Sequence, residues 1–196
     1  MSKYLLIVVA VAALVGFGAY AQTTGTFKDS RDGKTYRKVT IGGKTWMAEN
    51  LNFAAEGSKC YENENANCAK YGRLYNWATA LKACPAGFHL PLDNEWTALE
   101  NAVGGRSIAG KTLKSTADWN EEGNGTNDYG FSALPGGYGT FSGSFNDVGK
   151  DGDWWSATED HDNRALIRHV NSGNVGVFRS NIGRASLLSV RCVQDQ

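Results

Sequence analysis

The sequence predicts one α+β domain that is cross-linked by disulfides. Two segments with helical periodicity are followed by a loop-rich stretch and then by segments with the two-residue periodicity of strands. This order favours helices packed against a terminal antiparallel sheet. The 24 Gly among 196 residues, together with abundant Asn and Ser, are typical of long Gly/Asn-rich loops. The four Cys follow an export signal, so we expect them to be paired as disulfides.

The N-terminus has the pattern of a secretory signal. Lys3 precedes an apolar run over residues 4–20, and a small-x-small triplet ends at Ala21. We therefore predict a cleaved signal peptide at 1–21 and a single domain at 22–196, secreted or on the cell surface, with no membrane insertion after cleavage. A retained membrane anchor is the alternative, because the apolar run approaches the length of a bilayer span.

The first predicted element is a β-hairpin. Short runs of β-type residues at Lys34–Ile41 and Lys44–Met47 flank the pair Gly42-Gly43. Two consecutive glycines tolerate the positive φ angles of a tight turn, so this is the strongest hairpin signal in the chain.

Two helices are predicted next. Apolar residues recur at helical spacing from Tyr71 to Ala83, and Pro85 stops the helix soon afterwards. The second helix begins at about Asp93, whose carboxylate can cap the free N–H groups, and ends before Gly104-Gly105. We expect both apolar stripes to face the core.

Long loops and then strands complete the chain. The stretch from Lys111 to Asp153 is dense in Gly, Asn, Asp and Ser, which predicts loops. Four segments with strand periodicity follow, at Trp154–Ala157, Arg164–Val170, Val175–Phe178 and Leu187–Val193. We expect them to be adjacent strands of an antiparallel sheet.

The four cysteines allow three disulfide pairings, and sequence alone cannot choose among them. Proximity favours Cys60 with Cys68, which leaves Cys84 with Cys192. The chain-entropy model values so long a loop at roughly 4 to 5 kcal/mol. A metal site at these cysteines is disfavoured, because Cys60 and Cys68 lack the close spacing of zinc knuckles and no His lies near them.

Signals for catalysis are weak. Residues Gly105–Thr112 satisfy the phosphate-binding pattern G-x-x-x-x-G-K-[ST], but a predicted helix rather than a strand precedes them, so we predict no nucleotide binding. His89, His161 and His169 are scattered along the chain, and we predict that the protein is not an enzyme. The 20 basic and 20 acidic side chains contain no basic run, which excludes nucleic acid as an expected partner.

Six motifs together resemble a known family. They are Trp46–Leu51, Cys68–Trp77, Cys84–Pro91, Gly130–Tyr138, Trp154–Thr158 and Ser189–Val193. In this order and spacing the chain resembles the Fibrobacter succinogenes major paralogous domain family. The resemblance implies a secreted or surface domain of bacteria with a C-type-lectin-like fold, related to the formylglycine-generating enzymes, but it implies no settled biochemical activity.

The chain departs from the family pattern between Asn174 and Leu187. Relatives often have an Asn-rich strand and turn there, whereas this chain has Phe178, Arg179, Ile182 and Arg184. If that surface binds a ligand, we expect its specificity to differ.

We expect a binding site where aromatic side chains alternate with amides and carboxylates. An aromatic face covers the C–H face of a sugar ring, while amides and carboxylates bond its hydroxyls. The candidate ligand-binding residues are Trp119, Tyr138, Phe141, Asn146, Asp147, Asp151, Asp153 and Trp154. Strand alternation places Trp154 and Trp155 on opposite faces, so we expect one of the two to be buried and the other to be a candidate for contact.

No cofactor is predicted, with a structural calcium ion as the alternative. Asn146, Asp147, Asp151 and Asp153 would give oxygen ligands in one loop, an arrangement that Ca²⁺ accepts. The chain lacks the Glu-Pro-Asn and Trp-Asn-Asp signatures of sugar-binding C-type lectins.

These observations favour a non-catalytic binding module for carbohydrate binding or adhesion. The expected partner is a polysaccharide or a cell-surface protein. A structural or protein-interaction module of the cell surface is the alternative. An unrecognised hydrolase is more remote, because the separation of paired carboxylates cannot be read from a sequence.

Overall fold

The computed structural model describes residues 23–196, so the predicted signal peptide at 1–21 lies outside the described residues. The described part contains the helices α1 (Asn65–Tyr71), α2 (Trp77–Ala83), α3 (Asp93–Ala102) and α4 (Arg106–Leu113), and a short 3-10 turn at Tyr61–Asn63. The strands are β1 (Thr24–Lys28), β2 (Thr35–Ile41), β3 (Lys44–Met47), β4 (Leu74–Tyr75), β5 (Phe88–His89), β6 (Tyr138–Gly139), β7 (Phe145–Asn146), β8 (Asp151–Glu159), β9 (Arg164–Asn171), β10 (Phe178–Gly183), β11 (Leu188–Ser189) and β12 (Val193–Gln194).

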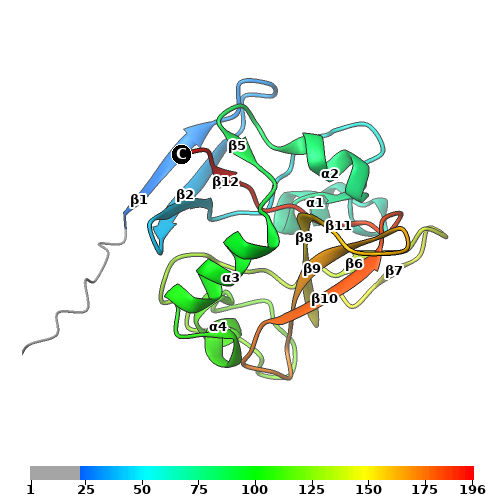
Figure 1. Ribbon diagram of the computed structural model, residues 1–196. Coiled ribbons are helices and arrows are strands. Elements are labelled where there is room, and N and C mark those ends of the chain that lie inside the picture. Colours follow the sequence, from blue (N-terminus) through cyan, green and yellow to red (C-terminus); the bar gives the residue numbers. More distant parts are fainter. Residues whose placement is uncertain (1–22) are drawn as a thin grey trace, which may run out of the picture.

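The first sheet has the strand order β1-β2-β3-β12-β5 and is antiparallel throughout. The β2–β3 hairpin confirms the prediction from Gly42-Gly43, whose φ angles are +60° and +80°. The C-terminal strand β12 lies between the hairpin and β5, with Val193 opposite both Trp46 and His89. Both ends of the domain therefore belong to this sheet (Figure 1).

The second sheet has the order β10-β9-β8-β11-β4. Strands β8, β9 and β10 are antiparallel neighbours, whereas β11 runs parallel to β8. The predicted strands at Trp154–Ala157 and Arg164–Val170 are confirmed within β8 and β9. The predicted strand at Leu187–Val193 is instead divided between the two sheets, and the red C-terminal segment in Figure 1 passes from one sheet to the other.

The prediction of a strand at Val175–Phe178 is wrong except at its last residue, where β10 begins. The backbone of this segment is used elsewhere: Lys111 N–H donates to Val175 O at 2.8 Å, and Val177 N–H donates to Arg106 O at 2.9 Å. These bonds attach the segment to α4, so it cannot also pair as a strand.

The prediction of two helices is also wrong, because the described residues form four. The predicted helix from Tyr71 to Ala83 is interrupted after Tyr71 by Gly72, whose φ of +79° ends α1. A Cβ at Gly72 would lie 2.9 Å from Leu51 O, so packing against the neighbouring chain requires glycine there. After β4 the chain starts α2, where the Asn76 side chain accepts a hydrogen bond from Thr79 N–H at 2.9 Å.

The helix from Asp93 is confirmed as α3, but Asp93 does not cap it. The Glu95 carboxylate accepts the N–H of Leu92 at 2.9 Å, while the Asp93 carboxylate accepts bonds from Arg168 and Arg179. Helix α4 occupies the phosphate-loop pattern that begins at Gly105. The pattern lies in α4, which follows α3 directly, and no strand lies between the two helices.

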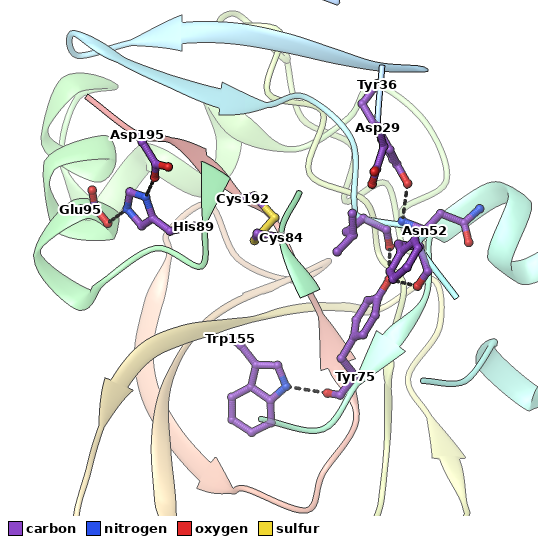
Figure 2. The surroundings of a disulfide bond; sticks show 12 residues. Asp29, Tyr36, Asn52, Tyr75, Cys84, His89, Glu95, Trp155, Cys192 and Asp195 are labelled. Atoms are coloured by element: carbon purple, nitrogen blue, oxygen red, sulfur yellow. Dashed lines mark hydrogen bonds and ion pairs between the residues drawn. A yellow bond between two sulfur atoms is a disulfide. The ribbon is translucent and has the colours of Figure 1, made fainter. Parts of the chain in front are cut away.

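Two disulfides, Cys60–Cys68 and Cys84–Cys192, confirm the pairing that proximity favours. The second bond joins residues 108 positions apart and ties the end of α2 to the chain before β12 (Figure 2). It therefore links α2 to the chain that enters β12, which lies between β3 and β5 in the first sheet.

Two buried clusters form the core, and the adjacent residues Trp154 and Trp155 belong to different ones. Trp154 packs with residues of α3 and α4, such as Trp96 and Leu113. Trp155 packs with residues of α2, and its indole N–H donates to Tyr75 O at 2.7 Å (Figure 2). Both faces of β8 are covered at this point, so the expectation that only one of the two tryptophans would be buried is wrong.

Candidate functional site

Two of the sequence-predicted ligand residues lie in the core. Trp119 is 4% exposed and its indole N–H donates to Ala133 O at 3.1 Å. Trp154 is 1% exposed and donates to Asn50 Oδ1 at 2.8 Å. Because each ring is covered and each donor is satisfied inside the protein, neither side chain offers a surface to a ligand. The structure thus excludes Trp119 and Trp154 as candidate ligand-binding residues.

Phe141 has the opposite environment. It lies in the turn that joins β6 to β7 and its side chain is 85% exposed. The turn is closed by the backbone bond from Thr140 N–H to Ser144 O at 2.8 Å, so the phenyl ring stands at the tip of a hydrogen-bonded hairpin.

Tyr138 and the acidic residues are brought to one place by strand pairing. Tyr138 lies opposite Asn146 in the β6–β7 hairpin, and a bridge between Gly137 and Gly152 joins this hairpin to β8. Gly137 has a φ of +62°, and a Cβ there would lie 2.4 Å from Asn146 O, so only glycine permits this close approach. Tyr138 is consequently held beside the start of β8, which carries Asp151 and Asp153.

The β8–β9 register adds a residue that the site prediction left out. Asp153 lies opposite His169, and the Asp153 Oδ1 atom is 2.9 Å from His169 Nδ1. Asp151 lies opposite Asn171, whose Nδ2 atom is 3.3 Å from His169 Nε2. Asp151, Asp153 and His169 present ligand atoms within 4.8 Å of one another, and we call them the carboxylate–histidine cluster.

The pKa shifts show that the cluster is electrostatically coupled. Burial raises the pKa of the Asp151 carboxyl; His169 opposes this rise, and the Asp153 and Asp147 carboxylates add to it. Burial disfavours protonated His169, but its hydrogen bond to the Asp153 carboxylate and the nearby negative charges outweigh burial and raise the pKa of the imidazole. Burial, followed by the charge of Asp147, raises the pKa of Tyr138. All three shifts are those expected for a region of negative potential.

A groove of about 550 Å³ borders the cluster. It is open to solvent and lies over β9 and β10, lined by Ile167, His169, Asn171, Phe178, Arg179, Ser180, Asn181 and Ile182. His169 lines the groove and also belongs to the cluster, so the two features are continuous. The Phe178 ring is 40% exposed and its centroid lies 5.9 Å from that of His169.

A second cleft, of about 320 Å³, lies between the β2–β3 hairpin and α1. It contains none of the candidate binding residues. Its basic side chains Lys34, Arg37 and Lys70 form ion pairs with neighbouring carboxylates. Fewer side chains of the groove over β9 and β10 form ion pairs within the protein, and the Phe178 ring is exposed there. This groove is therefore the better candidate site.

The structure therefore retains part of the predicted site and adds to it. Backbone bonds bring the Tyr138 strand, Asp147 and the start of β8 together, since Gly137 N–H donates to Asp151 O and Asp151 N–H donates to Asp147 O, both at 2.8 Å. Sequence reasoning missed His169 and Phe178 as site residues. The signal that could have found them is cross-strand pairing, since His169 faces Asp153 on β8 and Phe178 on β10.

The fold and the site define a disulfide-linked α+β domain with an open groove beside a carboxylate–histidine cluster. The described residues 23–196 form no helix that is long and apolar enough to cross a membrane, and the disulfides are consistent with an extracellular protein.

The chain belongs to the Fibrobacter succinogenes major domain family, whose model matches residues 39–194. The match confirms the resemblance and supports a bacterial origin. It includes all four cysteines, the carboxylate–histidine cluster and the groove. Searches of the curated proteins and of the solved structures found no significant match.

Proposed function

We propose that the protein is a secreted or cell-surface, non-catalytic module that binds polysaccharide in the groove over β9 and β10. The observation that carries this proposal is the exposed Phe178 ring beside the polar groups of His169, Asn171 and Ser180. An aromatic face next to hydroxyl, amide and imidazole groups suits a sugar, which has both a C–H face and a ring of hydroxyls.

The position of the groove in the chain supports this assignment. Phe178, Arg179 and Ile182 line it, and these residues lie in the segment 174–187, where we expect the chain to depart from the family pattern. A binding surface on a regular strand pair can change specificity by side-chain replacement without disturbing the fold. We infer that these residues adapt the groove to the particular glycan of this protein.

The arrangement of the carboxylates supports binding rather than hydrolysis. A glycosidase needs two carboxyl groups that flank the scissile bond. Asp151 and Asp153 are two residues apart on β8, so both project from the same face of one strand. Asp153 is also engaged with His169.

We further propose that the α+β fold is C-type-lectin-like and that residues 1–21 direct export. Antiparallel sheets, two disulfides and long Gly/Asn-rich loops support the first point, whereas four helices exceed the two that were expected. The disulfides support export, because such bonds persist in oxidising compartments.

A protein-interaction role is the second candidate, and Phe141 is the observation that favours it. A phenylalanine that is 85% exposed on a hairpin tip is a suitable contact for a partner protein at the cell surface. In this case the Phe141 hairpin, not the groove, would carry the binding.

The two roles can be separated with matched aromatic variants. Residues 22–196 are tested on a glycan array and with insoluble plant and bacterial polysaccharides, as wild type, Phe178→Ala and Phe141→Ala. Glycan binding that falls at least tenfold in Phe178→Ala and is unchanged in Phe141→Ala supports the proposal. Absence of binding across the panel, or equal binding by wild type and Phe178→Ala, refutes it.

A further inference from the structure

We propose that the carboxylate–histidine cluster binds a divalent first-row transition-metal cation of the zinc type. Asp151 and Asp153 on β8 and His169 on β9 would be its protein ligands. This inference does not rest on glycan binding, because it shares only His169 with the groove and has its own readout.

The geometry meets the requirement of a metal centre. One ligand atom from each residue lies within 4.8 Å of the other two. Zinc bonds of about 2.0 to 2.2 Å place tetrahedral ligands roughly 3.4 Å apart, so the most distant ligand atoms need to close by at most about 1.4 Å. Asp153 Oδ1 and His169 Nδ1, at 2.9 Å, need to separate by about 0.5 Å to reach the same spacing. Both changes require side-chain rotation, whereas the register of β8 and β9 fixes the backbones.

The three ligands are held by a rigid scaffold. Asp153 is only 5% exposed, and its carboxylate is oriented by His169. The backbones of Asp153 and His169 are paired in a sheet, which limits the freedom of both side chains. A site on strands loses less entropy on binding a ligand than a site on loops.

Asp151 has a side chain that is free to bind a cation. It is partly buried beside Asp153 and His169 in the cluster. Among residues 23–196 no hydrogen bond to its side chain is formed. A bound cation would be a partner for the Asp151 carboxylate and would reduce its repulsion from Asp153.

The donor set determines the class of cation. The sequence offered calcium only as an alternative, in a loop of oxygen ligands that included Asn146. Asn146 lies in β7 opposite Tyr138, and a histidine belongs to the cluster instead. Calcium and magnesium prefer oxygen ligands throughout, whereas zinc and its neighbours in the series accept imidazole nitrogen with carboxylates. The cluster therefore favours Zn²⁺, Co²⁺ or Mn²⁺ over Ca²⁺.

Isothermal titration of residues 22–196 with Zn²⁺ and with Ca²⁺ tests the inference. We expect one Zn²⁺ site per chain and Zn²⁺ binding at least tenfold tighter than Ca²⁺ binding. Asp151→Asn should weaken Zn²⁺ binding at least tenfold with little change in folding, because this side chain has no partner to lose. His169→Gln should also weaken Zn²⁺ binding at least tenfold, although it removes the contacts of His169 with Asp153 and Asn171. Circular dichroism checks that each variant is folded.

His161→Gln is the matched control. His161 is an exposed histidine beside Asp160 and lies outside the cluster, so its replacement should leave the Zn²⁺ affinity unchanged. Absence of Zn²⁺ binding at millimolar metal overturns the proposal, as does equal Zn²⁺ binding by wild type and Asp151→Asn. Ca²⁺ binding as tight as Zn²⁺ binding overturns the assigned class of cation. Phe178→Ala leaves the cluster intact, so a failure of glycan binding and a failure of metal binding are distinguishable.

Discussion

Replacing Trp154 with alanine provides a strong test of the structure, because the same residue looked like a ligand contact in the sequence. The structure places its ring in the core beside Trp96, with the indole N–H bonded to Asn50. Trp→Ala in a core costs about 3 to 5 kcal/mol. The lost hydrogen bond adds less than the full penalty of an unpaired group, because Arg191 Nη2 still donates to Asn50 Oδ1 at 2.8 Å.

The assay is urea unfolding of residues 22–196 with both disulfides intact. With a slope of about 2 kcal/mol per molar urea, a loss of about 4 kcal/mol lowers the midpoint by about 2 M. Domains of this kind have a total stability of about 5 to 15 kcal/mol, so Trp154→Ala should be severely destabilised.

Trp154→Phe is the control, because it keeps an aromatic ring and removes the N–H donor. We expect it to cost about 1 to 2 kcal/mol. A fall of less than about 0.5 M in the midpoint of Trp154→Ala, at a slope of about 2 kcal/mol per molar, would show that Trp154 is not a core residue and would refute this reasoning.

Two further predictions concern the Cys84–Cys192 bond and His89. Replacing both cysteines of the long disulfide by alanine should destabilise the domain by about 4 to 5 kcal/mol, against about 2.5 kcal/mol for the short one, as thermal unfolding of the two double variants can measure. His89 lies between two carboxylates, with its Nδ1 atom 2.6 Å from Asp195 (Figure 2). Burial opposes its charge, but these hydrogen bonds prevail and raise its pKa from 6.5. Its ion pairs therefore stabilise the fold fully below about pH 6.5, and this contribution is lost as pH rises through the higher folded pKa. Thermal midpoints between about pH 5.5 and 8.5 should fall more in wild type than in His89→Gln, and parallel curves would contradict the assignment.

Local signals explain which elements could be predicted. The Gly42-Gly43 hairpin and helix α3 depend on turn residues and periodicity within a few positions, and both are confirmed. Gly72 interrupts a helical pattern because the neighbouring chain at Leu51 leaves no room for a Cβ. Helix α4 was missed because Gly104-Gly105 precedes it and Gly110 lies within it, which lowers the helical signal, whereas bonds to Val175 and Val177 hold it in place.

The candidate site was predictable only in part. The acidic residues around Asp151 stand out in the sequence because they are close together along the chain. His169 and Phe178 join them through strand register, which a single sequence does not reveal. Trp154 and Tyr138 were both candidate ligand-binding residues, yet Trp154 is buried and Tyr138 borders the acidic residues at the start of β8.

The sequence by itself determined the α+β class, because periodicity and turn glycines act over short distances along the chain. Four cysteines after an export signal indicated disulfides, and the resemblance of six motifs indicated the family. Only the tertiary structure decided which aromatic rings face water and which titratable groups meet. Those properties depend on packing between segments that are far apart in sequence, as between Asp153 and His169. Burial and pKa shifts arise from these long-range contacts, so the chemistry of the site became visible only in the folded protein.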